Sequence, residues 1–227
     1  MNSAMPRRHP GLGLQLATLC VAAAVSVDVS AATSERTFEQ VFNDQGEPSA
    51  LHYQVVFTSE GAEHRLEVWR DGSRRLKRRT DETIETYAFR KPGDPEFHMS
   101  ILDMKKRIHT RIDRTNLYRI GNFIDWFDLA HGLKRPMGKY RVAKAQPPDG
   151  VPKAIDACQW YDLIQGERTT HVCWSMQSRL PLVIQPRGGE VVWRVVALDR
   201  KPIPAKTFEI HDEGFVRNDA NRDIEND

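Results

Sequence analysis

The chain has 227 residues, of which 40% are hydrophobic and 28% are charged. Its 33 lysine and arginine residues face 31 aspartate and glutamate residues, so the formal net charge is only +2. This near balance provides no long-range positive field of the kind that attracts nucleic acid or an anionic membrane surface. Length and apolar content are sufficient for one domain with a hydrophobic core.

The first 31 residues have the pattern of a secretory signal peptide. Arg7 and Arg8 supply positive charge, residues 12–27 form an apolar stretch, and residues 29–31 provide small side chains for cleavage. The apolar stretch is shorter than the run of about 20 residues that a transmembrane helix needs. We therefore expect a mature chain that starts near Ala32 and is exported to the periplasm of a Gram-negative type envelope.

A period of two dominates the hydrophobic pattern after this segment. Leu51, Tyr53 and Val55 alternate with polar neighbours, for example, which predicts a half-buried β-strand. Similar segments separated by turn signals predict strands over residues 51–58, 65–69, 73–79, 84–89, 97–104, 107–112, 139–145, 183–186 and 191–198. Together they indicate a meandering antiparallel sheet.

Residues 115–133 have helical spacing instead. Their apolar side chains recur three or four positions apart, Thr115 can cap the N-terminus, and Gly132 suits the position after the C-terminus. A single helix with so wide an apolar face has to be covered by another element. The sheet is the candidate for that role.

Residues 158–174 have the pattern of a β-hairpin, with Gln165-Gly166 as a two-residue turn. This turn places Cys158 opposite Cys173, close enough for a disulfide. The third cysteine, Cys20, leaves with the signal peptide, so the two others reach an oxidising compartment. We expect them to form a disulfide, the alternative being two unpaired buried thiols.

The predicted elements define one folded domain over residues 32–211, which Phe208 and Ile210 close. Residues 212–227 are polar and acidic and contain a single aromatic side chain. This composition predicts a mobile tail.

The C-terminal half resembles the periplasmic lipoprotein-carrier (LolA/LolB-like) superfamily, and looks closest to its exported members with a Cys pair. The likeness rests on Cys158-x-Trp-Tyr, Cys173-Trp-Ser, Leu180-Pro-Leu and a following Val/Trp strand. It implies a mainly β (α+β) fold, in which a curved antiparallel sheet forms an incomplete β-barrel with a helix against its concave face. It also implies an apolar cavity for lipid or acylated ligands, and the family has no catalytic motif.

Apolar residues of the predicted helix and strands would line such a cavity. The candidates are Phe123, Trp126 and Phe127 from the helix, and Val55, Phe57, Ile101, Trp160, Trp174 and Trp193 from the strands. The alternative is a fully packed core, because aromatic stripes more often form core than ligand sites. A half-barrel is too wide for its own side chains to fill easily, which favours a cavity if the resemblance holds.

A nearly contiguous run of cations forms a candidate basic surface, made of Arg74, Arg75, Lys77, Arg78 and Arg79. Such a surface suits anionic lipid headgroups, with membrane contact that is peripheral at most, or an acidic protein partner in the envelope. The alternative is a solvated strand whose charges protect a sheet edge from aggregation. We expect no nucleic-acid partner.

The sequence contains no pattern typical of catalysis or of a metal centre. It has no G-x-S-x-G motif, both mature cysteines are committed, and its histidines lack metal-ligand spacing. We therefore expect a non-enzymatic protein without cofactor or metal, which binds a hydrophobic or lipid-like ligand as a carrier or sensor in the cell envelope. The alternative is a structural or regulatory envelope module that binds a protein partner through its basic strands.

Overall fold

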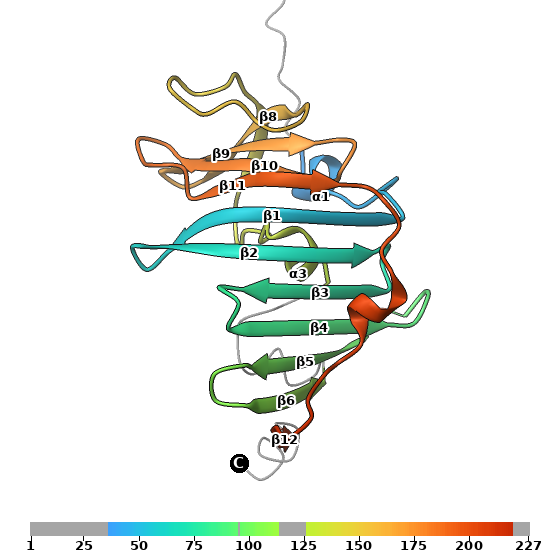
Figure 1. Ribbon diagram of the computed structural model, residues 1–227. Coiled ribbons are helices and arrows are strands. Elements are labelled where there is room, and N and C mark those ends of the chain that lie inside the picture. The colour runs from blue at the N-terminus through green and yellow to red at the C-terminus, as the bar shows by residue number, and fades with distance from the viewer. Residues whose placement is uncertain (1–35, 95, 114–125, 220–227) are drawn as a thin grey trace, which may run out of the picture. The chain divides into compact units, whose positions relative to one another are not determined.

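A twelve-stranded β-sheet dominates the computed structural model, which describes residues 36–94, 96–113 and 126–219, all within the unit Ser34–Asp227 (Figure 1). The strands are β1 (Ala50–Ser59), β2 (Ala62–Asp71), β3 (Arg75–Thr80), β4 (Ile84–Arg90), β5 (Phe97–Asp103), β6 (Ile108–Asp113), β7 (Arg141–Lys144), β8 (Gln159–Gln165), β9 (Arg168–Ser175), β10 (Leu180–Pro186), β11 (Trp193–Asp199) and β12 (Val216–Asp219). The described helices are α1 (Phe38–Val41), α3 (Trp126–His131) and the 3-10 turn η1 (Ala205–Phe208).

The sheet consists of two antiparallel meanders that share one joint. Strands β1 to β6 follow one another, as do β7 to β11, and the pairing of β1 with β11 joins the two sets. Strands β7 and β12 lie at opposite ends of the strand order, so the sheet is not closed into a barrel. The predicted fold class, a mainly β protein with a curved, incomplete barrel and a helix against it, is confirmed.

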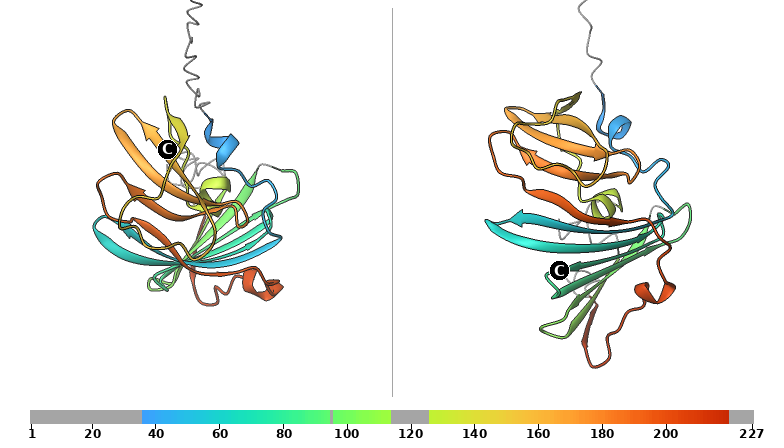
Figure 2. Two further views of the ribbon diagram at one scale, coloured as in Figure 1. Left: turned by 90° about the horizontal axis from the view of Figure 1, so that it is seen from above. Right: turned by 45° about the horizontal axis from the view of Figure 1, so that its top comes forward.

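The two α-helices lie within the curve of the sheet (Figure 2). Strand alternation explains this arrangement, because most strands have one apolar, buried face and one largely polar face. Leu51, Tyr53 and Val55 of β1 all belong to the buried set and are at most 1% exposed. This concave face and the helices enclose one continuous hydrophobic core.

Helix α3 is the described part of the helix predicted over residues 115–133, and residues 114–125 lie outside the described ranges. It ends as the sequence predicts. Gly132 has a φ of +67° and its N–H donates to the carbonyl of Asp128 at 2.9 Å. Glycine adopts this left-handed conformation without steric cost.

Helix α1 was not predicted from the sequence, although a local signal for it exists. Thr37 and Gln40 form a capping box, in which each side chain accepts a hydrogen bond from the other residue's backbone N–H. The helix is only four residues long, too short for a helical period to be visible. It buries Phe38 and Val41 in the concave core.

The predicted register of the β8–β9 hairpin is wrong by two residues. Trp160, and not Cys158, lies opposite Cys173, because the turn has Gly166 in its first central position, with a φ of +57°. A two-residue hairpin turn with glycine first is favoured since its twist matches that of the strands. The prediction placed Gly166 second.

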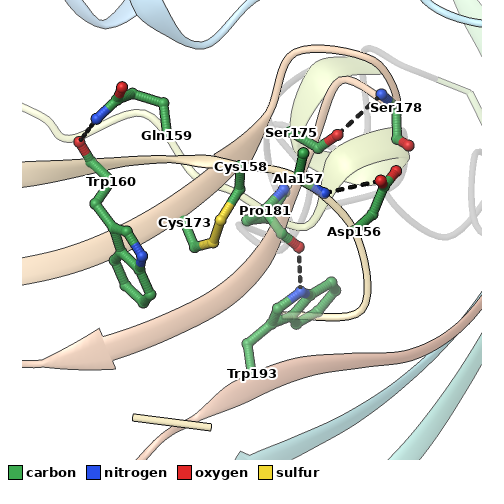
Figure 3. The surroundings of a disulfide bond; sticks show 10 residues. All are labelled: Asp156, Ala157, Cys158, Gln159, Trp160, Cys173, Ser175, Ser178, Pro181 and Trp193. Carbon is green, nitrogen blue, oxygen red and sulfur yellow. Dashed lines mark hydrogen bonds between the residues drawn. A yellow bond between two sulfur atoms is a disulfide. The ribbon is translucent and has the colours of Figure 1, made fainter. Parts of the chain in front are cut away.

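The predicted disulfide between Cys158 and Cys173 is present despite that shift (Figure 3). A shift of two residues keeps each side chain on the same face of the sheet, so Cys158 becomes a diagonal neighbour of Cys173. Cys158 also lies just before β8 begins, where the chain can bend, and the two Cα atoms are 5.4 Å apart. Cys173 is fully buried.

The chain after β11 crosses the convex face of the sheet and adds β12 beside β6 in parallel (Figures 1 and 2). The segment predicted to be a mobile tail thus contains a strand as far as Asp219. Asp212 fixes it, since its carboxylate accepts bonds from His109 at 2.7 Å and from Arg217 at 2.9 and 3.1 Å. The bonds from Arg217 and His109 lower the pKa of Asp212 to about 2. Amino-acid composition alone cannot predict such pairing, because His109 and Asp212 are far apart in the sequence.

Removing the disulfide should lower the free energy of unfolding without changing the fold. We expect the C158S/C173S variant to lose about 3 kcal/mol, because the unfolded chain gains the entropy of an open 15-residue loop. Urea unfolding with and without a reducing agent measures this loss. The reductant should destabilise the wild type by a similar amount and leave the variant unchanged, and an effect on the variant would contradict the assignment.

The variant Gly132→Ala should destabilise the protein more than a matched substitution elsewhere. A Cβ atom at Gly132 would overlap the ring of Trp193, which cannot move aside freely because its Nε1–H donates to the carbonyl of Pro181 at 2.9 Å. Gly138 has a similar φ of +79° with no atom within 4 Å of its hypothetical Cβ.

We expect Gly138→Ala to cost about 1 kcal/mol for the left-handed backbone, and Gly132→Ala about 1–3 kcal/mol more for the overlap. Urea unfolding of both variants measures the difference. Equal losses would show that the Gly132–Trp193 contact does not hold α3 against the sheet.

Candidate ligand-binding face under helix α3

Three polar side chains of the sheet hold the C-terminal end of α3. The carbonyl of Ala130 accepts hydrogen bonds from the Tyr53 hydroxyl at 3.0 Å and from Arg70 Nη1 at 3.4 Å. The carbonyl of Leu129 accepts one from Arg78 Nη1 at 3.3 Å. The last carbonyls of a helix have no partner within the helix and carry partial negative charge. Side chains from strands β1, β2 and β3 therefore cap the C-terminal end of α3.

Arg70 is fully buried and connects four separate parts of the chain. It extends from β2 to the carbonyl of Ala130 and also donates through Nη2 to the carbonyl of Ser178 at 3.0 Å. The carboxylate of Glu47 lies 3.5 Å from the same Nη2 atom. The Nε atom of Arg70 has no hydrogen-bond partner in the described part of the chain.

His131, the last residue of α3, lies on the other side of the Glu47 carboxylate. Its Nδ1 contacts the carbonyl of Phe127 at 3.0 Å, and its Nε2 is 3.5 Å from Glu47 Oε2. Burial lowers the pKa of His131, which favours the neutral form of the ring. Burial also raises the pKa of Glu47, but the His131 ring and the charge of Arg70 outweigh this effect and hold it below its usual value.

Aromatic side chains fill the space between α3 and the sheet. Phe127 stacks on His131 and on Trp174, with ring centroids 4.2 and 6.1 Å apart. Trp126 packs edge-on against Phe97 at 5.6 Å. A ligand that binds to this concave face therefore has to displace α3.

The structure assigns most of the predicted cavity residues to the concave core. Val55, Trp126, Trp160, Trp174 and Trp193 are buried in it, Phe57, Ile101 and Phe127 pack partly buried against it, and Phe123 lies outside the described residues. An open pocket of about 330 Å³ borders the N-terminal side of this region, where Phe127 meets Phe38 and Phe42 of the α1 segment. The structure thus brings the described residues of the predicted cavity together in one core, where most of them contact one another.

The predicted basic surface is divided between the two faces of the sheet. Arg78 points to the concave face and binds α3, whereas Lys77 and Arg79 point to the convex face. Lys77 and Arg79 both pair with Glu85, at 3.1 and 3.0 Å. Arg75 pairs with Asp71 and lies over the ring of Phe208, and Arg74 is exposed. The run is contiguous in sequence but not in space.

Of the residues that anchor α3, Tyr53 and Arg70 were not among the predicted site residues, and Arg78 was predicted only as part of a basic surface. Tyr53, Arg70 and Arg78 all occupy the inward phase of their strands, as Leu66 and Val68 do in β2. An arginine in the apolar phase of an alternating strand has to find a buried partner. That pattern would have identified Arg70 and Arg78 as unusual positions.

Comparisons with known proteins add no assignment. No family model matches the chain, and a search of curated proteins found no similar sequence. The resemblance to the lipoprotein carriers therefore stays a prediction from short motifs. Among the residues that the structure describes, no helix is long and apolar enough to span a membrane.

The stability of the protein should fall as the pH drops from about 7 to about 5, in part because of His131. Its folded-state pKa lies below the usual value of 6.5, so the unfolded chain binds more protons at this position. The neutral ring contributes fully to the free energy of unfolding above about pH 6.5, and this contribution is lost as the pH falls toward the folded-state pKa. One such group contributes at most about 1.4 kcal/mol per pH unit.

Urea unfolding of wild type and His131→Asn at several pH values tests this expectation, and the advantage of the wild type should shrink on acidification. His64 provides a control of opposite sign. The hydrogen bond to Asp81 raises the pKa of His64, so its contribution is present at low pH and is lost as the pH rises. The advantage of the wild type over His64→Gln should therefore grow on acidification. Parallel curves for wild type and His131→Asn would contradict the buried neutral ring.

Proposed function

We propose that the protein binds a hydrophobic or lipid-like ligand on the concave face of the sheet, as a carrier or sensor that is exported to the periplasm. The observation that carries this proposal is the way α3 covers that face. A short helix with aromatic side chains occupies an extended apolar surface, and the described bonds at its C-terminal end are few. Displacement of α3 would expose the part of the concave apolar face that it covers.

The contacts that hold α3 favour such a displacement. The bonds from Arg78 and Arg70 to the helix carbonyls are 3.3 and 3.4 Å long, whereas N–H···O bonds in proteins are most often about 2.9–3.0 Å long. Each contributes about 1 kcal/mol or less in net terms. Burial of an acyl chain gains about 25 cal/mol per Å² of apolar area, which is enough to offset these bonds.

The disulfide is compatible with export, because such bonds persist in oxidising compartments. The signal-peptide pattern points in the same direction. We do not favour the alternative of a protein partner bound through the basic strands, since Lys77, Arg78 and Arg79 are engaged within the fold.

The uncharged dye Nile red tests the proposal, because its fluorescence rises in an apolar site. We expect saturable binding by the wild type and tighter binding by Arg78→Gln. Loss of one bond worth about 1 kcal/mol raises the population of the open form about five-fold, and the apparent affinity rises with it. Arg79→Gln is the matched control, since the neighbouring side chain points to the convex face and should leave the affinity unchanged.

Native mass spectrometry of protein purified from the periplasm, followed by organic extraction, would identify a bound lipid directly. Absence of saturable Nile red binding by wild type and Arg78→Gln would overturn the proposed function. Equal affinities of Arg78→Gln and Arg79→Gln would leave ligand binding in place but exclude α3 as the element that controls it.

A further inference from the structure

Three arginine side chains of the sheet extend toward the space under α3. Arg70, Arg78 and Arg90 come from three consecutive strands, and all three reach the concave side. Arg90 lies over the ring of Trp126, with its guanidinium carbon 4.5 Å from the ring centroid. Buried cations are normally paired with carboxylates.

Many of the partners that these arginines have are neutral carbonyl oxygens. They belong to Ala130, Leu129 and Ser178, and to Ser73, which binds Arg90. In the described part of the chain, the one carboxylate beside Arg70 is that of Glu47, at 3.5 Å. One of the three described polar partners of the fully buried Arg70, the carbonyl of Ala130, thus belongs to a helix end that the proposed function requires to move.

Unsatisfied polar atoms gather at the same place. Arg70 Nε, His131 Nε2 and Glu47 Oε2 are buried and make no hydrogen bond of ordinary geometry among the described residues, although His131 Nε2 and Glu47 Oε2 lie 3.5 Å from each other. Native proteins satisfy nearly all buried polar atoms, so a group of exceptions needs an explanation. Departure of α3 would also remove the carbonyl of Ala130 from Arg70 and the carbonyl of Leu129 from Arg78.

We infer that the ligand is an anionic amphiphile whose carboxylate or phosphate replaces the α3 carbonyls at Arg70 and Arg78 while its apolar chain covers the concave face. This inference rests on the proposed function and specifies its ligand class. A charged oxygen accepts stronger hydrogen bonds from guanidinium than a carbonyl does. The anion therefore competes with the end of α3 for the same donors, and its chain competes with the aromatic side chains of α3.

Displacement of bound Nile red by two compounds of equal chain length tests the inference. At about pH 8, where its carboxylic acid is ionised, dodecanoate should displace the dye about ten-fold more efficiently than the uncharged dodecanol. Free acetate at the same concentration should not displace it, which distinguishes a lipid headgroup from a small anion.

Variants at Arg78 distinguish the effect of its charge on ligand preference from the effect of its hydrogen bond to α3. In Arg78→Gln, dodecanol should bind more tightly than in wild type, whereas the preference for dodecanoate should shrink severalfold. Arg78→Lys should retain part of the preference because it keeps the charge. Arg79→Gln should retain the whole preference, since Arg79 lies on the opposite face.

Equal displacement by dodecanoate and dodecanol would overturn the anionic ligand and leave the proposed function intact. Displacement by acetate would also overturn it, because the site would then bind a free anion and not an amphiphile. A wild type that never binds Nile red, dodecanoate or dodecanol would overturn both the inference and the proposed function.

Discussion

The arrangement of this protein depends on the hydrogen bonds and the ion pair that the buried guanidinium of Arg70 forms. A charge that is removed from water without partners costs several kcal/mol, so it constrains everything around it. Its partners come from α3, from the turn at Ser178 and from Glu47, which are far apart in sequence. These groups meet only when the sheet curves and brings both meanders around α3. Satisfying one cation therefore selects the curvature, the position of α3 and the path of the chain before β1.

The curvature in turn decides what kind of surface the molecule has. Two open meanders joined through β1 and β11 present one large concave face, and a sheet of this width needs cover for its apolar side chains. The short helices α1 and α3 provide part of that cover with Phe38, Phe127 and Trp126. On the convex face, cations and carboxylates neutralise one another, as the buried Lys77 and Glu85 do, and the segment after β11 covers part of that face.

The sequence predicts the local features of this fold well and its long-range pairing poorly. Alternation of side chains predicts strands because it follows from backbone geometry alone, and Gly132 predicts a helix end for the same reason. The β8–β9 register was missed by two residues because either side of Gly166 can form a turn, although the disulfide survives the shift. The role of Arg70 requires knowledge of which carbonyls lie above it, and that depends on segments 60 and 108 residues away in sequence.

The chemistry of two attachments indicates which part of the molecule can move. The segment after β11 is fixed to the convex face through the carboxylate of Asp212, which accepts bonds of 2.7–3.1 Å from the largely buried His109 and from Arg217. The end of α3 is fixed to the concave face through carbonyls at 3.0–3.4 Å, beside polar atoms for which the described residues offer no hydrogen-bond partner. A carboxylate side chain of α3 placed over Arg70 would bind the guanidinium more strongly than the Ala130 carbonyl does, without a change in the backbone. The anionic headgroup that we propose would supply such an acceptor to Arg70 in place of the Ala130 carbonyl.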